Sequence, residues 1–447
     1  MNDHKVFRDP IFKLISFHKV KEKTIIDLIN APEIQRLKRI RQLGFTYYTF
    51  PTGVHDRFSH SLGVSFLAGR MIEALNLNEL ITIDNSVKGG KVQITKDQLK
   101  LLVQIAGLLH DIGHGPFSHA FEKISGTNHE DLTVEIIKTP GTGVNRILGQ
   151  ITDELLRTNI INWLIDIYKG VFTPSWIKEI ISSQLDADRL DYLLRDAYMC
   201  GVKYAAFDLE WLLSNLELNE IRSVNDQNVL RLSINGEKGI HSVESFIVSR
   251  YHMYEQVYYH KTTRGFEKLL QKIFERAQEL QRTGKSQPSI DPTFDRFIKE
   301  KKIFDFLILD DFYMLTLINL WARSSEDEIL KNICRFLIDR EPYKMFKAVS
   351  NKQLFTKEHY NKIEDILKEK VQYYFFEDDY KDNPYKDTYL LGKSSPEKAE
   401  QIWLKNKKGE MVELSTASPI IKSITNEDFN KYRAYIHRDY YLLVKDF

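Results

Sequence analysis

The sequence predicts a mainly α fold with small β-hairpins and an α+β carboxyl-terminal region. Apolar residues recur at helical spacing through most of the chain, as Phe58, Leu62 and Met71 do within residues 56–77. Strict alternation of apolar and polar residues is confined to short runs, such as NVLRLSI at 228–234. The chain contains no internal repeat and no low-complexity tract. These observations together indicate a globular and mostly helical protein.

In chain order, the first clear helix is predicted over residues 56–77. The polar stretch 84-DNSVKGGKVQIT-95 follows, and its Gly-Gly pair predicts an exposed turn or a short hairpin. Residues 96–112 are strongly apolar and predict a second helix, which ends at the glycines and the proline that follow it.

The next strong helix is predicted over residues 175–199, directly after Pro174. Residues 219–240 predict a small β-hairpin, and a long helix is predicted over residues 240–281. The polar stretch 282-RTGKSQPSIDP-292 is the candidate domain boundary.

Beyond that boundary, shorter helices are predicted, followed by 401-QIWLKNKKGEMVELS-415. This stretch predicts two strands around a Lys-Lys-Gly turn. We therefore expect two units, residues 1–281 and 282–447. The second unit is expected to pack on the first and to take part in assembly.

Composition and charge exclude several classes of protein. The 447 residues carry a net charge of +1, so no overall basic field favours nucleic acid or a membrane surface. The two cysteines, Cys200 and Cys334, fit a reducing cytoplasm and exclude a disulfide framework. The amino terminus, MNDHKVFRDPIFKL, has charges throughout, and no run in the chain is long enough to span a bilayer. The sequence thus predicts a cytoplasmic protein whose anion sites are local.

The stretch 108-LLHDIGHGPFSHAFE-122 is the strongest functional signal in the chain. His110 and Asp111 stand where a buried helix ends, and neutral imidazole with carboxylate is a good ligand set for a divalent metal. Two ligands do not hold a catalytic metal, but His60 and Asp188, on two other apolar-striped helices, could complete the set. A lone histidine on an apolar helix is usually structural. The density of histidines around His110 argues against that interpretation here.

Several longer strings carry a resemblance to a known family. They are 41-RQLGFTYYTFP-51, 57-RFSHSLGV-64, 106-AGLLHDIGHGPFSHAFE-122 and 186-DADRLDYLLRDA-197. With the four predicted ligands, they resemble the HD-domain metal-dependent phosphohydrolases, and among these the dNTP triphosphohydrolase branch. That branch includes bacterial relatives of the vertebrate SAM-and-HD-domain dNTPase. The resemblance is dense over residues 5–265 and looser in 410–419 and 435–437.

The resemblance implies an HD-domain helical core, with residues 1–281 as the catalytic unit. It implies cleavage of a dNTP substrate into a deoxynucleoside and inorganic triphosphate. A divalent metal ion (Mn, Mg, Fe, Ni or Zn) would polarise the phosphate and lower the pKa of a bound water. The resemblance further implies a homotetramer, with an activating nucleotide such as dGTP bound between subunits.

The resemblance also assigns roles to individual residues. The implied metal ligands are His60, His110, Asp111 and Asp188, and the implied catalytic residues are His114, His119, Glu122 and His129. Among these, His119 is the candidate acid for the departing O5′. The implied substrate-binding residues are Gln42, Leu43, Arg57, Arg189, Tyr192, Asp196, Arg250, Tyr254 and Tyr258. The implied activator-binding residues are Lys5, Val6, Asn30, Gln35, Lys38 and Lys261.

The chain departs from the vertebrate enzyme at several of these positions. Glu122 and Asn30 stand where that enzyme has Asp, and Arg189 stands where it has Lys. Tyr254 replaces a His. These departures leave the role of Glu122 and the identity of the activator open.

Several alternatives stay open at this point. Another HD phosphohydrolase would act on nucleoside monophosphates, cyclic nucleotides or guanosine alarmones. A non-enzymatic protein that senses nucleotides or binds nucleic acid could be built on the same scaffold, although the neutral net charge does not support nucleic-acid binding. Without the resemblance, 250-RYHMYEQVYYHK-261 is typical of an amphipathic helix with aromatic packing. Asp191 and Arg195 are interpreted as an ordinary i,i+4 ion pair.

Overall fold

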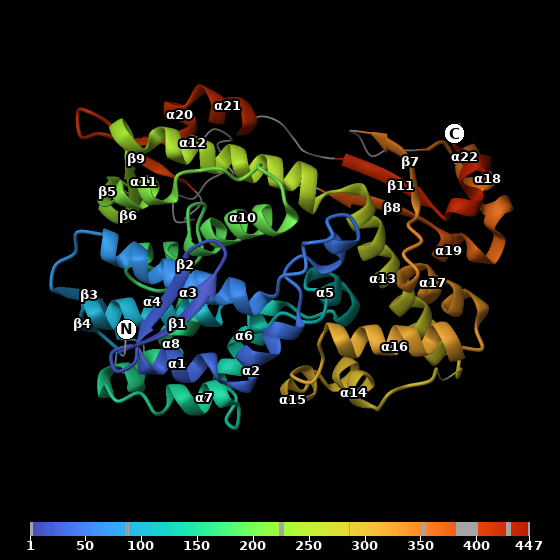
Figure 1. Ribbon diagram of the computed structural model, residues 1–447, viewed down its shortest axis with the longest axis horizontal. Coiled ribbons are helices and arrows are strands. Elements are labelled where there is room, and N and C mark those ends of the chain that lie inside the picture. Colours follow the sequence, from blue (N-terminus) through green and yellow to red (C-terminus); the bar gives the residue numbers. More distant parts are fainter. Residues whose placement is uncertain are drawn as a thin grey trace.

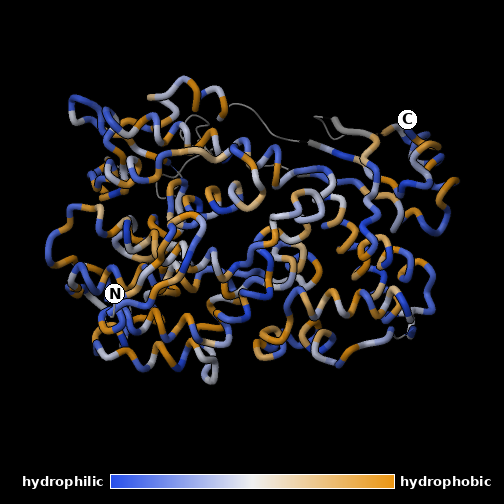
Figure 2. The backbone as a smooth tube through the Cα atoms, viewed as in Figure 1, coloured by the Kyte–Doolittle hydropathy of each residue, from blue (hydrophilic) through white to orange (hydrophobic). Residues whose placement is uncertain are grey.

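The computed structural model describes residues 3–85, 87, 89–222, 228–285, 287–349, 355–380, 401–425 and 431–445. Helices dominate these residues, and the strands form small sheets, which confirms the mainly α fold. Figure 1 shows α3, α4, α8 and α10 gathered in its left part and α13, α14, α16 and α17 in its right part. Figure 2 shows hydrophobic and hydrophilic segments alternating along the chain. Among the described residues, no helix has the length and apolar character needed to cross a membrane.

The helices of the first half of the chain are α1 (Lys23–Ile29), α2 (Pro32–Arg36), α3 (Arg57–Ala74), α4 (Lys96–Leu109), α5 (His119–Ser125), α6 (His129–Lys138), α7 (Gly143–Leu148), α8 (Glu154–Tyr168), α9 (Ser175–Glu179) and α10 (Ala187–Cys200). The later helices are α11 (Leu209–Ser214), α12 (Gly236–Met253), α13 (Lys261–Arg282), α14 (Thr293–Glu300), α15 (Ile303–Phe306), α16 (Asp311–Ser324), α17 (Glu328–Ile338), α18 (Lys357–Leu367), α19 (Val371–Tyr374), α20 (Leu414–Ala417), α21 (Pro419–Thr425) and α22 (Tyr441–Val444). The single 3₁₀ turns are η1 (Leu37–Arg39), η2 (Gly44–Tyr48), η4 (Lys368–Lys370) and η5 (Arg438–Tyr440), and η3 (Tyr254–Tyr258) is a π-helical turn.

Helices α3 and α4 form the centre of the amino-terminal part, and their caps fix where they begin. The Asp56 side chain accepts a hydrogen bond of 2.8 Å from the Ser59 N–H, which starts α3. Thr95 and Gln98 form a capping box at the start of α4. The two helices pack along their lengths, and most of their apolar side chains are fully buried. This pair therefore provides a rigid support for the segment that follows α4.

The strands are β1 (His4–Asp9), β2 (Lys13–His18), β3 (Leu80–Asp84), β4 (Lys91–Thr95), β5 (Leu216–Arg222), β6 (Asn228–Asn235), β7 (Lys344–Val349), β8 (Phe375–Tyr380), β9 (Trp403–Lys405), β10 (Met411–Glu413) and β11 (Lys431–Ile436). They form hairpins β1–β2 and β3–β4, a sheet of order β7-β11-β8, and a sheet of order β10-β9-β6-β5. In the last sheet, β9 pairs in parallel with β6, so that Ser233 lies opposite Trp403. The chain after residue 400 thus returns to the β5–β6 hairpin.

The three predicted hairpins are present. Strands β3 and β4 pair antiparallel within the region predicted as a turn or hairpin, as do β9 and β10 further on. Strands β5 and β6 form the third, and residues 223–227 between them lie outside the described residues. The division of the chain at residues 282–292 stays a prediction.

The single helix predicted over residues 175–199 is wrong. Helix α9 ends at Glu179, and α10 begins only at Ala187. The cause is Asp186, a fully buried residue whose carboxylate accepts hydrogen bonds of 2.7 Å from the N–H groups of Ser183 and Arg189. A side chain that binds these N–H groups starts a new helix and does not continue an old one.

The single helix predicted over residues 240–281 is also wrong. Helix α12 ends at Met253, and the π-helical turn η3 follows, with the Tyr259 N–H bonded to the Tyr254 carbonyl at 2.9 Å. Helix α13 then begins after His260, whose ring accepts from the Thr262 N–H at 3.3 Å. The apolar spacing on either side of this break is helical, so periodicity alone did not reveal it.

Candidate active site

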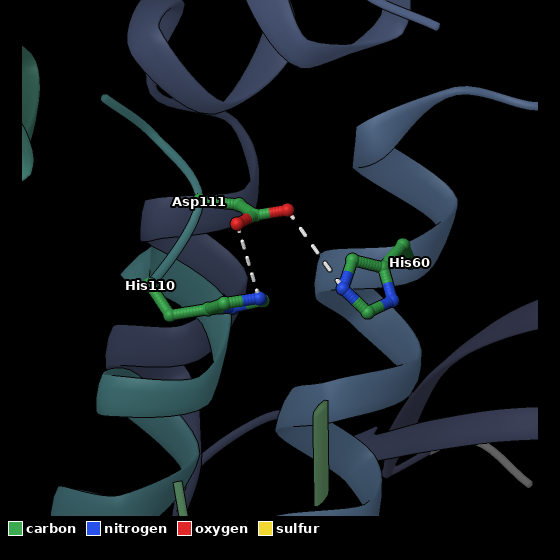
Figure 3. Close-up of side chains that lie close together, drawn as sticks. All are labelled: His60, His110 and Asp111. Atoms are coloured by element: carbon green, nitrogen blue, oxygen red, sulfur yellow. Dashed lines mark ion pairs between the residues drawn. The ribbon is translucent and has the colours of Figure 1, made fainter. Parts of the chain in front are cut away.

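The four predicted metal ligands lie together, although they come from three separate segments. His60 projects from α3, His110 and Asp111 follow α4, and Asp188 lies in the first turn of α10. His60 Nε2 is 3.0 Å from Asp188 Oδ1 and 3.7 Å from Asp111 Oδ2, and His110 Nε2 is 3.3 Å from Asp111 Oδ1. Figure 3 shows the side chains of His60, His110 and Asp111 pointing toward one another.

His60 is oriented by a second carboxylate on α10. Its Nδ1 lies 2.8 Å from Asp191 Oδ2, and Arg195 donates two hydrogen bonds of 2.8 Å to the same carboxylate. Asp191 and Arg195 were expected to form an ordinary helix pair, but both are almost fully buried and the pair holds His60. Gly63 makes this approach possible, because a Cβ there would come within 1.8 Å of Asp191 Oδ1.

His110 is oriented by the backbone. Its Nδ1 lies 2.7 Å from the Gly107 carbonyl, which fixes Nδ1 as the donor and leaves Nε2 without a proton when the ring is neutral. That buried Nε2 has no hydrogen-bond partner among the described residues. One ligand atom from each of His60, His110 and Asp111 can be chosen so that all lie within 4.8 Å of one another. An imidazole and carboxylate set with one orphaned nitrogen fits a divalent transition metal.

The charges around this group are strongly coupled. Burial lowers the pKa of His60, but its contacts with Asp188 and Asp191 outweigh burial and raise the pKa to about 10. Burial raises the pKa of Asp111, but Arg57 and His110 outweigh it and hold that pKa well below its usual range. The carboxylates are therefore ionised near neutral pH, and a metal ion would displace a proton from His60.

A second group of side chains, His114, His119, Glu122 and His129, lies beside the first. The Glu122 carboxylate is 2.9 Å from His119 Nδ1 and 2.5 Å from His129 Nδ1. The rings of His114 and His129 are stacked with centroids 4.0 Å apart. Burial and the nearby Arg57 hold the pKa of His114 well below its usual range, so His114 is neutral. The His119 side chain is 70% exposed, in contrast to buried His114.

The loop between α4 and α5, which carries His114, is strained. Phe117 and Ser118 have φ angles of 54° and 56°, a region of backbone conformation that residues other than glycine rarely adopt. Arg57 donates two hydrogen bonds, of 2.9 Å and 2.7 Å, to the Ser118 hydroxyl and also pairs with Asp111. Arg57 thus joins the loop to the carboxylate of Asp111, one of the predicted metal ligands.

Sequence reasoning missed Asp311, which fixes this loop from the far side. Its Oδ1 accepts from the Phe117 N–H at 2.8 Å, and its Oδ2 accepts from the Arg41 N–H at 2.9 Å. Burial raises the pKa of Asp311 to about 6, although the two N–H groups oppose this shift. No local pattern reveals such a contact, because Asp311 lies 194 residues from Phe117.

Both groups of side chains open into one cavity of about 520 Å³. The predicted substrate-binding residues in its wall are Gln42, Leu43, Arg57, Arg189, Tyr192, Asp196, Tyr254 and Tyr258. Arg250 is not among the lining residues; it is buried and donates to Gln184 Oε1 at 2.6 Å. Glu122 is also not among the lining residues, and it contacts His119 and His129, which are.

A buried carboxylate and aromatic rings form one part of the cavity wall. Asp196 is 2% exposed, and the Tyr258 hydroxyl donates to its Oδ2 at 2.8 Å. The rings of Tyr192 and Tyr258 meet edge to face with centroids 6.1 Å apart. Arg189, Tyr192 and Asp196 follow one another along α10, so the cavity wall changes from cationic to aromatic to acidic.

The predicted activator-binding residues lie outside this cavity. Lys5 and Val6 are on β1, Asn30 ends α1, Gln35 is on α2 and Lys38 is on η1. Lys261 is the first residue of α13. Figure 1 places β1 and α1 in its left half and α13 in its right half. The predicted activator-binding residues are therefore spread over several elements, β1, α2, η1, α13 and the end of α1.

Comparison with known proteins identifies relatives of the chain. Residues 57–196 match the HD domain, and residues 208–291 match the HD associated region. The uncharacterized protein YwfO of Bacillus subtilis is 36% identical over 443 residues, or 98% of this chain and 93% of YwfO. The deoxynucleoside triphosphate triphosphohydrolase SAMHD1 of Homo sapiens is 28% identical over 78% of this chain and 55% of that protein. A crystal structure of the phosphohydrolase BT4208 from Bacteroides thetaiotaomicron has a TM-score of 0.78 at 26% identity, covering 97% of this chain and 100% of that one.

Proposed function

The chain belongs to the HD-domain phosphohydrolase family, and on that premise we propose that it is a metal-dependent dNTP triphosphohydrolase. It would cleave a dNTP into a deoxynucleoside and inorganic triphosphate. One observation carries the proposal: the group of metal-ligand candidates and the Arg189, Tyr192 and Asp196 series share a single cavity. Seven residues of helix separate Arg189 from Asp196 by about 10 Å, comparable with the distance between the phosphates and the sugar hydroxyl of a nucleotide.

Each group of residues has a role in this reaction. A divalent metal held by His60, His110, Asp111 and Asp188 would supply Lewis-acid activation of the α-phosphate. Arg57, on α3, and Arg189, on α10, both line the cavity and would offer guanidinium groups to the phosphate oxygens. Neutral His114 can accept a proton or a hydrogen bond from the attacking water. His119 would protonate O5′, and the Glu122 carboxylate holds its ring.

The sugar would lie at the opposite end. Asp196 and Tyr192 face the cavity where the 3′-hydroxyl of a bound nucleotide would come. Leu43 would crowd the place of a ribose 2′-hydroxyl, and an apolar side chain leaves such a hydroxyl without a partner. Selection of deoxynucleotides over ribonucleotides is part of the proposal.

The proposal is tested by product analysis. The protein is incubated with each dNTP and Mn or Mg, with and without dGTP, and the phosphate product is identified. Release of intact triphosphate is expected. Asp111→Ala should abolish it, whereas Asp97→Ala, at an exposed carboxylate that pairs with Lys21 on the surface, should not. If no dNTP yields triphosphate under any combination, the proposal fails.

The same assay separates the proposal from its main alternative. An HD phosphohydrolase acting on nucleoside monophosphates, cyclic nucleotides or guanosine alarmones would release a single phosphate, a monophosphate or pyrophosphate. Those substrates are included as parallel reactions. The acidic and aromatic part of the cavity wall favours a substrate with a deoxynucleoside moiety. The two guanidinium groups, of Arg57 and Arg189, favour a substrate with more than one phosphate.

We further propose a cytoplasmic homotetramer that a nucleotide such as dGTP activates. The predicted activator-binding residues belong to β1, α2, η1, α13 and the end of α1 and do not line the substrate cavity, which supports a separate nucleotide site. The free, buried thiols of Cys200 and Cys334 support a reducing compartment. Sedimentation with and without dGTP tests the assembly. A monomer under both conditions would contradict it.

A further inference from the structure

His55 joins the two walls of the proposed sugar subsite without lining the cavity itself. Its side chain is buried, and its Nε2 lies 2.7 Å from Asp196 Oδ1. Its carbonyl accepts a hydrogen bond of 3.0 Å from the Gln42 N–H. One residue therefore contacts both the segment that carries Gln42 and Leu43 and the carboxylate at the end of the α10 series.

The contact with Asp196 fixes the direction of that carboxylate. Oδ1 is held by His55 and Oδ2 by the Tyr258 hydroxyl at 2.8 Å, so neither oxygen can rotate without losing a partner. Each carboxylate oxygen can accept two hydrogen bonds, which leaves each with capacity for a ligand. Asp196 lines the cavity, whereas the ring of His55 lies behind it. A hydroxyl donor in the cavity would therefore meet a carboxylate of fixed orientation.

The other nitrogen of His55 argues against a purely structural role. Because the carboxylate of Asp196 accepts, Nε2 carries the ring proton in the neutral tautomer. Nδ1 is buried and has no hydrogen-bond partner within the described part of the chain. An aliphatic side chain would fill this space without an unpaired polar atom, and a histidine is useful here only for the Nε2 donor.

We propose that His55 is a positioning residue for sugar recognition: its Nε2 donor holds Asp196 in the orientation that accepts the 3′-hydroxyl of the substrate. This inference rests on the proposed dNTP triphosphohydrolase function. Discrimination at the 2′ position of the sugar should not depend on the His55 side chain. The hydrogen bond that the Gln42 N–H donates to His55 uses the backbone carbonyl.

The test compares two substrates that differ only in the 3′-hydroxyl. Wild type, His55→Leu and His55→Gln are assayed with a dNTP and with the matching 2′,3′-dideoxynucleotide, and kcat and KM are measured separately. His55→Leu should lower kcat/KM for the dNTP on the order of tenfold, because a charge-assisted contact is lost. It should change kcat/KM for the dideoxynucleotide little. His55→Gln restores a donor near the position of Nε2 and should recover most of the loss.

Ribonucleotide turnover provides an internal control. Both the dNTP and its ribonucleotide carry the 3′-hydroxyl, so kcat/KM should fall by the same factor for each. The ratio of dNTP to ribonucleotide is therefore expected to stay constant in His55→Leu. A structural defect near Gln42 would change it.

The outcomes separate the inference from the function on which it rests. If wild type releases no triphosphate from any dNTP, the proposed function is overturned, and the inference with it. If wild type is active but His55→Leu loses equally on both substrates, or His55→Gln behaves as His55→Leu does, the role of His55 alone is overturned. Should His55→Leu fail to fold in a thermal melt, His55→Asn, whose shorter amide does not reach Asp196, replaces it in the same comparison.

Discussion

The catalytic cavity and the predicted activator surface are built in opposite ways. In the cavity, side chains are buried and held by partners from distant segments, as His60 is by Asp191, 131 residues away. On the activator surface, side chains are exposed or bonded close by in sequence, as Asn30 is to the Ile26 carbonyl at 2.8 Å and Gln35 to the Ile29 carbonyl at 2.6 Å. The contacts within one chain therefore orient the side chains of the cavity, whereas the hydrogen bonds of Asn30 and Gln35 are local in sequence.

Two buried side chains lie between these regions. Arg36, next to Gln35, is 1% exposed and donates to the carbonyls of Leu309 and His114, the latter at 3.0 Å. Asp311 binds the N–H groups of Arg41 and Phe117. The segment that carries Gln35 and Lys38 is thus hydrogen-bonded, through Arg36 and Asp311, to the segment between α4 and α5 that carries His114. On the proposed function, these bonds connect the activator residues to the catalytic ones.

The largest expected effect comes from metal removal, which should separate the two regions. Dialysis against a chelator should reduce triphosphate release below detection, because the phosphate loses its Lewis acid, and returning Mn should restore it. The change in sedimentation caused by dGTP should persist, because the activator residues lie outside the metal group. Loss of both responses together would show that the two regions are not independently formed.

Asp311, one of the two side chains that connect these regions, should make the free energy of unfolding depend on pH, by roughly 3 kcal/mol in total. Because the folded pKa of Asp311, about 6, lies above its ordinary value of 3.8, the folded state keeps a proton that the unfolded state loses between these pH values. The free energy of unfolding should therefore fall as the pH rises from 3.8 to about 6. Asp311→Asn cannot titrate and should lack this fall.

Denaturant unfolding at several pH values measures the difference between wild type and Asp311→Asn, and Asp97→Asn serves as an exposed control. Titrations common to all three proteins cancel in the differences. Parallel stability curves for wild type and Asp311→Asn would refute the assignment. Activity gives a second readout, because an amide can accept only one of the two N–H groups, and the loop at Phe117 should lose its fixed position.

A smaller effect is expected from replacing Asp191, whose carboxylate contacts His60 Nδ1. Asp191→Asn should lower metal affinity about 10- to 100-fold, the range typical of partners that orient a ligating histidine. Titration calorimetry with Mn measures this directly, without turnover. Asp97→Asn is again the control. Unchanged affinity in Asp191→Asn would mean that packing alone orients the His60 ring.

The fold class and the four candidate ligands could be predicted from the sequence, and the contacts that orient them could not. Helical periodicity and the pattern of His60, His110-Asp111 and Asp188 are properties of short windows and of a resemblance. The breaks before α10 and α13 were missed because a capping Asp186 and a π-helical turn leave the apolar spacing unchanged. Asp311 was missed because its partners are backbone N–H groups, which carry no side-chain signature.

The smallest expected effect tests the activator surface itself. Lys38 is exposed, with its ammonium 4.4 Å from the centroid of the Phe58 ring, the residue next to Arg57. A single exposed contact between a lysine and a phosphate contributes up to roughly 1 kcal/mol, so Lys38→Ala should raise the dGTP concentration for half-maximal activation about fivefold. Lys21→Ala, which removes a similarly exposed lysine near Asp97, is the matched control. An equal shift in both variants would mean that the surface acts through its general charge, and no shift in either would remove Lys38 from the activator site.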